Sequence, residues 1–146
     1  MRKIIICDID DCLSKVTRRK KYLGDHTPDW HKFHNAVMED ECNSWCKEII
    51  DAMVIRGYGI ILVTSRPEKV REKTKRWLKK NFVIYKELYM RPDDDKRDSS
   101  EVKEGIYMKH IFDKYKVLFV LEDRKKNVDM WRRKGLVCLQ NLDNNF

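Results

Sequence analysis

The sequence lacks long apolar runs and contains few glycines. No stretch approaches the ~20 apolar residues that are needed to span a bilayer, and the apolar run near Met1 is too short for a signal peptide. We therefore expect a soluble, cytoplasmic protein that does not bind membranes. The five glycines nowhere form the G-x-x-x-x-G-K-[ST] loop that cradles nucleotide phosphates, so a kinase activity of this chain is not expected.

A disulfide framework is missing as well. The five cysteines are an odd number in no secreted-scaffold spacing, and Cys7 lies inside an apolar run like a small buried hydrophobic residue. We expect free thiols in a reducing compartment. A zinc site can be drawn from His31-x-x-His34 and Cys42-x-x-x-Cys46, but this spacing matches no common zinc finger, and positions in the core or on a helix surface explain these residues.

The chain is strongly basic. Charged residues make up 38% of its 146 residues, and the formal net charge is +8. At this length we expect a single domain, residues 1–146, with one hydrophobic core. A basic surface suits a polyanionic substrate such as a nucleic acid.

Polar side chains follow three apolar runs, at residues 4–6, 60–63 and 117–121. Such runs are typical of buried parallel strands, whose carboxyl ends meet at the edge of the sheet where α/β proteins bind ligands. Clustered carboxylates repel one another unless a cation lies between them, so we expect a Mg²⁺ site that handles a phosphoryl group. The polar residues that follow the runs are Asp8 and Asp10, then Thr64, then Glu122 and Asp123.

Strand-like and helix-like patterns alternate along the chain, which predicts an α/β fold: a three-layer, Rossmann-like parallel sheet of about five strands. We expect strands at about 3–8, up to Thr64, at 84–90, up to Glu122 and at 136–139. Helices are expected from Trp45 to near Gly57, from Pro67, from a cap at Ser99 or Ser100, and through Trp131 to Gly135. The polar stretch 14–40 interrupts this alternation, and we expect it to be a small cap-like insertion over the site.

The sequence Asp8-Ile9-Asp10 carries the predicted chemistry. Alternate residues of an extended strand share a side, so both carboxylates can face one phosphate while Ile9 points into the core. One carboxylate would attack phosphorus, and the other would give a proton to the leaving oxygen and later take one from water. A lone D-x-D is more often an ordinary turn, but the other strand ends favour the catalytic interpretation.

Basic and hydroxyl side chains near these acids are candidates for phosphate binding. Thr64 can donate its hydroxyl to a phosphoryl oxygen or cap the helix that is expected from Pro67, whose N–H groups would point to the same place. Arg66 can bind a phosphate with its planar guanidinium or form a surface salt bridge. Lys103 is better placed than Lys109 to balance transition-state charge, because it lies nearer the start of its helix.

The order Asp8-x-Asp10, Thr64, Lys103 and Glu122-Asp123 resembles the four motifs of haloacid-dehalogenase-like phosphotransferases. More narrowly, about two thirds of the chain is similar to the 3′-phosphatase domain of phage polynucleotide kinase-phosphatases. The stretches that carry this resemblance are 57–66, 91–111 and 122–140, the last with Asp-Arg followed by Met-Trp-Arg-Arg.

The resemblance implies a Mg²⁺-dependent phosphomonoesterase that removes 3′-terminal phosphates from DNA or RNA ends, and a separate kinase or ligase as a partner. It implies an aspartyl-phosphate on Asp8 and acid–base catalysis by Asp10. The implied metal ligands are the Asp8 carboxylate, the Asp10 main-chain carbonyl and Asp123, with Glu122 acting through a metal-bound water. The implied phosphate contacts are Thr64 and Lys103, and the implied substrate contacts are Arg66 and Arg91.

The sequence departs from the family pattern after Asp10. Asp11 and Cys12 stand where Gly-Thr is usual, which removes the conformational freedom of glycine and one hydroxyl. Residues 14–40 have no close counterpart in the family pattern, so the resemblance says least about the choice of substrate. Trp30 and Phe33 in this stretch, and Trp45 after it, are either core residues or a stacking surface for an unpaired base.

Three other functions remain as alternatives. The first is a phosphatase of the same superfamily that acts on nucleoside monophosphates or another small metabolite. The second is a non-catalytic nucleic-acid-binding module that keeps the fold. The third is a phosphorelay receiver, which also uses clustered acids, Thr and Lys, but whose phosphate acceptor normally follows a middle strand and not the first.

Overall fold

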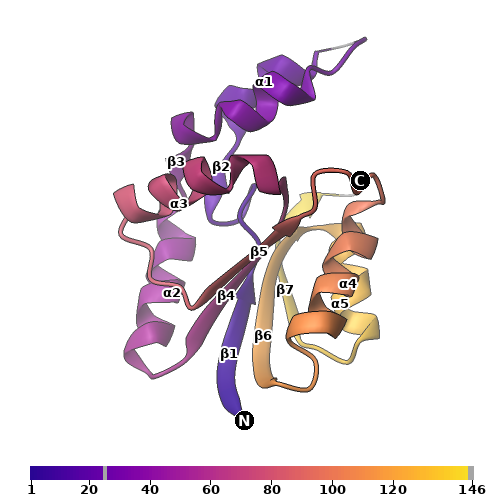
Figure 1. Cartoon of the computed structure of the whole chain (residues 1–146). Coiled ribbons are helices and arrows are strands. Elements are labelled where there is room, and N and C mark those ends of the chain that lie inside the picture. The colour runs from indigo at the N-terminus through magenta and orange to yellow at the C-terminus, as the bar shows by residue number, and fades with distance from the viewer. Residues whose placement is uncertain (25, 145–146) are drawn as a thin grey trace.

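A parallel sheet of five strands, in the order β5-β4-β1-β6-β7, forms the centre of the computed structural model (Figure 1). The structure describes residues 1–24 and 26–144. Every pair of neighbouring strands in this sheet is parallel, as the alternating pattern predicts. The strands are β1 (Arg2–Cys7), β4 (Gly59–Pro67), β5 (Glu87–Arg91), β6 (Tyr115–Arg124) and β7 (Cys138–Asn144).

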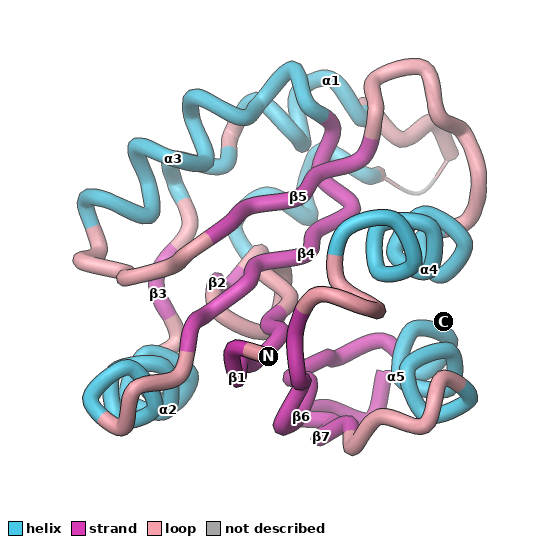
Figure 2. The backbone as a smooth tube through the Cα atoms, turned by 60° about the horizontal axis from the view of Figure 1, so that its bottom comes forward, coloured by secondary structure: helices cyan, strands magenta, loops and turns pink. Residues whose placement is uncertain are grey.

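Two helices cover each face of the sheet (Figure 2). One pair is α2 (Ser44–Ile55) and α3 (Arg71–Lys80), and the other is α4 (Ser99–His110) and α5 (Lys125–Arg133). Ile4 and Ile6 of β1 pack in the core with α4 and α5, whereas Ile5 and Cys7 pack in the core with α2 and α3. Because β1 is buried on both faces, it reads as a continuous apolar run. The predicted three-layer α/β fold is confirmed.

Residues 14–24 and 26–40 form a small insertion of short helices beyond the carboxyl ends of the strands (Figure 1). Its ends are joined by β2 (Ser14–Lys15), which pairs antiparallel with β3 (Glu41–Cys42). The Asp40 main-chain carbonyl accepts a hydrogen bond from the Trp77 indole (2.8 Å), which ties the insertion to α3. The insertion's helices are η1 (Thr17–Leu23), α1 (Trp30–Asn35) and η2 (Val37–Glu39), of which η1 and η2 are 3-10 helices.

The second sheet-covering helix, α3, begins later than the sequence suggests. Pro67 has extended backbone and still pairs with Arg91, so β4 continues past Thr64. A 3-10 turn, η3 (Glu68–Val70), follows before α3 starts at Arg71. The residue before a proline favours extended backbone, which explains the longer strand. The prediction that a helix starts near Pro67 was therefore wrong by about one turn.

Other element boundaries also differ from the expected ones. The cap of α4 is Asp98, whose carboxylate accepts from the Ser100 backbone N–H, while Ser99 and Ser100 lie inside the first turn. Strand β5 begins at Glu87 and not at Ile84, which lies outside the sheet with 58% of its surface exposed. Strand β7 begins later and runs further than residues 136–139. The helices among the described residues are too short and too polar to cross a membrane.

Candidate active site

A buried lysine joins the ends of β1 and β6 at the carboxyl edge of the sheet. Lys103, in the second turn of α4, donates from Nζ to Asp8 Oδ1 (2.7 Å) and to Glu122 Oε2 (2.8 Å). The Asp8 backbone N–H donates to the Leu121 carbonyl (3.0 Å), which keeps the end of β1 beside β6. The carboxylate oxygens of Asp8, Glu122 and Asp123 lie within 4.8 Å of one another, and all three residues are buried.

Burial and mutual repulsion dominate the electrostatics of this cluster. Burial raises the pKa of Asp8, the neighbouring Glu122 raises it further, and Lys103 offsets only part of this. Burial likewise raises the pKa of Asp123. Burial acts to lower the pKa of Lys103, but Asp8 and Glu122 outweigh it and hold the ammonium charged. Three carboxylates against one ammonium leave an excess of negative charge.

This donor set fits a magnesium ion. Carboxylate oxygens are the ligands that Mg²⁺ prefers, and the ion's charge would balance the excess that Lys103 leaves. Asp8 and Asp123 are the predicted ligands within the cluster. Glu122 also lies in it, but its Oε2 accepts from Lys103 and, at 3.2 Å, from the Trp131 indole. The carboxylate of Asp10 contacts other residues. The metal contact predicted for Asp10 is through its main-chain carbonyl.

Two buried arginines hold the carboxylate of Asp10. Arg66 donates to Asp10 Oδ1 from Nε (2.9 Å) and Nη2 (2.7 Å), and Arg19 donates to the same oxygen from Nη2 (2.8 Å). Both arginines also bind Asp40, which accepts from Arg19 Nε at 2.7 Å and from Arg66 Nη2 at 3.1 Å. Burial acts to raise the pKa of Asp10, but Arg66 and Arg19 outweigh it and lower that pKa well below its usual value.

Sequence reasoning missed Arg19 and Asp40. Arg19 lies in a run of four basic residues, 18–21, in which nothing marks the one that is buried. Asp40 comes from the end of the insertion, and its carboxylate is fully buried. Together with Asp10 and Arg66 these residues form a charge-balanced group of two carboxylates and two guanidiniums.

The other predicted phosphate-binding residues lie beside this group. Thr64 is buried at the end of the apolar part of β4, and its Oγ1 accepts from the Arg66 backbone N–H (3.1 Å). Arg91 donates to the main-chain carbonyls of Ser65 (3.1 Å), Asp95 (3.0 Å) and Arg97 (2.6 Å), so it shapes the loop after β5. The helix N-terminus that was expected beside Thr64 is replaced by the η3 turn.

A cleft of about 520 Å³ opens above the cluster and below the insertion. All the residues predicted to act in catalysis or to bind the metal or the substrate line it except Glu122, which is buried and contacts Lys103. Other basic side chains also border it, namely Lys20, Lys69, Lys96, Arg97 and Arg124. The sequence-predicted residues in its walls are Asp8, Asp10, Thr64, Arg66, Arg91, Lys103 and Asp123.

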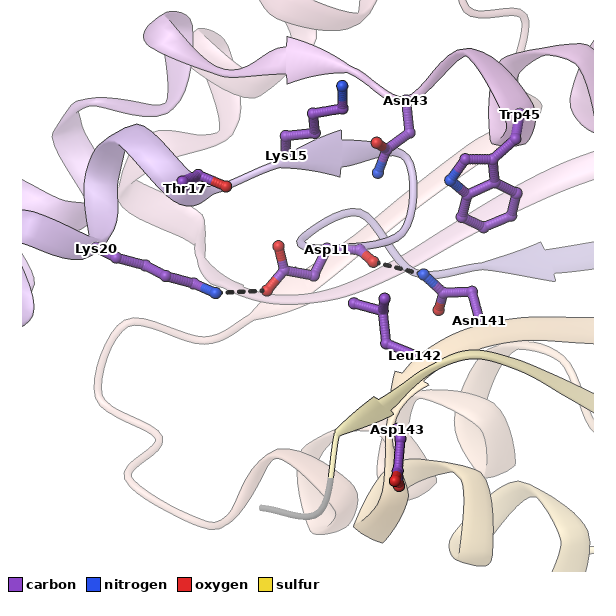
Figure 3. A pocket seen from close by; sticks show the side chains of 9 residues that line it. All are labelled: Asp11, Lys15, Thr17, Lys20, Asn43, Trp45, Asn141, Leu142 and Asp143. Carbon is purple, nitrogen blue, oxygen red and sulfur yellow. Dashed lines mark hydrogen bonds and ion pairs between the residues drawn. The ribbon is translucent and has the colours of Figure 1, made fainter.

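A second pocket, of about 470 Å³, lies on the other side of Asp11 and is lined by Asn43, Trp45 and Asn141 among others (Figure 3). Asp11 stands where the family has glycine, and its backbone adopts the left-handed region (φ 58°). Aspartate tolerates this region better than most residues do. The Asp11 carbonyl accepts from Asn141 Nδ2 (2.9 Å), and its carboxylate lies 3.5 Å from Lys20 Nζ, so the turn is fixed by contacts.

The cysteines and histidines do not come together as a zinc site in the part of the chain that the structure describes. All five are free thiols, as expected. Cys46 packs in the core with Cys7 and Cys12, and its Sγ lies 3.6 Å from that of Cys7. His31 is exposed on α1, and His34 borders the cleft. Within residues 1–24 and 26–144, neither cluster of possible metal ligands contains a histidine.

Known proteins similar to this chain include a viral protein and a chain of an RNA repair complex. A viral protein named "Putative bifunctional polynucleotide kinase/RNA ligase", from Autographa californica nuclear polyhedrosis virus, is 29% identical over 139 residues, which are 89% of this chain and 18% of that protein. A chain in the "Structure of the Pnkp1/Rnl/Hen1 RNA repair complex" has a TM-score of 0.89 and 32% identity, covering 100% of this chain and 44% of that one. This chain thus spans less than half of either protein.

The same fold occurs in more distant enzymes. D,D-heptose 1.7-bisphosphate phosphatase from B. bronchiseptica, solved with magnesium and phosphate, has a TM-score of 0.57 at 13% identity and covers 96% of this chain and 80% of its own. The family described as "Polynucleotide kinase PNKP phosphatase domain" matches residues 2–146. The chain therefore belongs to this family, and it is a phosphatase of the haloacid-dehalogenase type.

Proposed function

We propose that this phosphatase removes 3′-terminal phosphates from DNA or RNA ends, that it requires Mg²⁺, and that it forms an aspartyl-phosphate on Asp8. The observation that carries the proposal is Lys103, which bridges Asp8 and Glu122 beside Asp123 at the floor of the cleft. Mg²⁺ bound by Asp8, Asp123 and the Asp10 carbonyl would neutralise charge on the phosphate and orient it.

Asp8 is the proposed nucleophile. A carboxylate oxygen of Asp8 bonds to phosphorus while the bond from phosphorus to the 3′ oxygen breaks, which leaves an acyl phosphate on the enzyme. Lys103 Nζ lies 2.7 Å from Oδ1 of this nucleophile and needs no rearrangement to offset the charge that develops. Thr64 borders the same cleft and can donate its hydroxyl to a phosphoryl oxygen.

Asp10 is the proposed acid and base. Its contacts with Arg66 and Arg19 favour the ionised carboxylate, which suits the second step, in which it takes a proton from the attacking water. The first step needs a proton on Asp10 for the leaving 3′ oxygen. A bound phosphate adds negative charge nearby and competes for Arg66, and both effects raise the pKa of Asp10.

The proposed substrate follows from the charge of the molecule and from its relatives. A net charge of +8 and the further basic side chains around the cleft suit a polynucleotide end. The family description names a polynucleotide kinase, and two relatives are named for a kinase/RNA ligase and for an RNA repair complex. We propose that this chain acts on ends that a kinase or ligase processes further.

A panel of phosphorylated substrates tests the proposal. We expect Mg²⁺-dependent phosphate release from oligonucleotides with a 3′-phosphate, and much slower release from 5′-phosphate, 2′,3′-cyclic phosphate and free nucleotides. A chelator should abolish release. Preferred hydrolysis of nucleoside monophosphates would instead support the small-metabolite alternative, in which the insertion closes over a small ligand in the cleft.

The Asp8→Asn variant tests the mechanism. Turnover should disappear, whereas oligonucleotide binding should persist, because one repelling charge is removed. Asp113→Asn, at an exposed position in the turn between α4 and β6, is the matched control and should keep full activity. Unchanged phosphate release by Asp8→Asn would contradict the role of Asp8, and binding without any turnover in the unaltered protein would identify a nucleic-acid-binding module.

A further inference from the structure

The wall of the cleft that the insertion provides is mainly apolar, unlike the floor. Val16, Leu23, Trp30 and Phe33 line it, together with Lys20 and His34. Trp30 is 54% exposed, which is unusual for the largest apolar side chain. A cleft with a charged floor and an apolar wall suits a ligand that carries a phosphate at one end and an aromatic group at the other.

The Trp30 indole is held in place by its neighbours on α1. It meets the Phe33 ring edge to face (5.6 Å, 87°) and stacks on the His34 imidazole (5.8 Å, 24°). Phe33 is itself buried, with the Arg19 guanidinium 4.4 Å from its ring centre. Because these contacts restrict the indole before any ligand arrives, binding costs little side-chain entropy.

His34 adds an unsatisfied polar atom to this wall. Its Nδ1 is buried and has no hydrogen-bond partner among residues 1–24 and 26–144. Burial lowers the pKa of His34 to about 4, so the imidazole is neutral near pH 7. A buried polar atom without a partner is unfavourable, and a ligand group that hydrogen-bonds to it would remove this cost.

We propose that the Trp30–His34 face of α1 binds the base of the 3′-terminal nucleoside. The inference rests on the proposed function, since it concerns the ligand of the same cleft. The 3′-phosphate lies at Asp8 and Lys103, the sugar spans the cleft, and the base stacks on Trp30. Every base has a π-face, so this contact accepts any terminal base, while it distinguishes a nucleotide end from a phosphate that lacks a base.

Removal of the indole in Trp30→Ala tests the contact. Two oligonucleotides are compared, one with an ordinary 3′-phosphorylated terminal nucleotide and one with an abasic 3′-phosphorylated terminus. We expect Trp30→Ala to lower kcat/KM about 5- to 100-fold for the ordinary end, as stacking on one aromatic side chain predicts, with little effect on the abasic end. Trp30→Phe should restore most of the loss.

Trp45→Ala is the matched control. Trp45 is also a partly exposed tryptophan (38%), but it lines the second pocket beyond Asp11. Its replacement should leave the ratio between the two substrates unchanged. If Trp30→Ala slows both substrates equally, or if the unaltered protein does not distinguish them, the nucleoside contact is refuted while the phosphatase proposal stands.

Binding to Asp8→Asn separates this inference from the proposed function. Equilibrium affinities for the ordinary and abasic ends are measured with Asp8→Asn and with Asp8→Asn/Trp30→Ala. The first protein should prefer the ordinary end and the second should not, whether or not the unaltered enzyme shows 3′-phosphatase activity. Equal affinities of Asp8→Asn for both ends would overturn the inference by themselves.

Discussion

Lys103 is the residue on which the arrangement of the acids depends. Its side chain is almost fully buried, and its ammonium contacts Asp8 and Glu122, which come from opposite ends of the chain. Buried ion pairs add little to stability in total, but loss of one partner leaves the others uncompensated. Loss of Lys103 should therefore lower both the stability of the protein and its catalytic rate.

Lys103→Ala should therefore destabilise the protein by about 3–5 kcal/mol in the absence of Mg²⁺ and should reduce kcat at least 100-fold. Lys109→Ala, which removes an exposed lysine from the same helix, is the control and should change neither quantity measurably. Urea unfolding and phosphate release measure the two effects. Equal stability and activity of both variants would show that Lys103 does not hold the acids together.

At the scale of elements, Asp40 joins the insertion both to the sheet and to α3. The Asp40 carbonyl accepts from Trp77 of α3, and its carboxylate accepts from Arg19 of η1 and from Arg66 of β4. These contacts fix α1 above the cleft and hold Arg66 against Asp10 at the same time. The position of the insertion and the hydrogen bonds that Asp10 accepts are thus coupled.

Asp40→Asn tests this coupling, because it keeps the shape of the side chain but removes its charge. We expect a loss of about 3–5 kcal/mol in the free energy of unfolding and a marked fall in kcat. Asp51→Asn breaks the partly exposed pair with Lys47 and should cost less than about 1 kcal/mol. Denaturant midpoints compare the two, and coinciding midpoints would argue against a structural role of Asp40.

The predictable part of the site is the part that follows the strands. Asp8, Thr64 and Asp123 were found because a buried parallel strand leaves a local pattern, an apolar run that stops at a polar residue. Arg19 and Asp40 were not found because their burial results from contacts between segments far apart in the chain. The start of α3 was misplaced because β4 gains pairing with β5 as far as Pro67, which local propensity does not reveal.

At the scale of the molecule, positive charge surrounds an acidic floor. The net charge is +8, and basic residues border the cleft that contains Asp8, Asp10 and Asp123. Such a field attracts a polyanion from a distance, while the acids and Lys103 act only on the phosphate that reaches them. The long-range attraction of the strand and the local contacts with the phosphate differ in how strongly they depend on salt concentration.

The KM for a 3′-phosphorylated oligonucleotide should rise about 10-fold or more between 50 and 200 mM NaCl, because counterions compete for the strand. The KM for a 3′-phosphorylated mononucleoside should change much less, since it offers no further phosphates. Steady-state kinetics at several salt concentrations measure both. Parallel salt dependence for the two substrates would speak against contacts with the strand beyond its end.

The pairing of β2 with β3 brings Ser14 directly beside Cys42. The segment between them thus leaves and re-enters the core at one narrow neck, so its length or content can change while the neck, and the strand ends behind it, stay where they are. Relatives could therefore differ in this whole segment, and so in the ligands they prefer, while the residues that act on the phosphate stay unchanged.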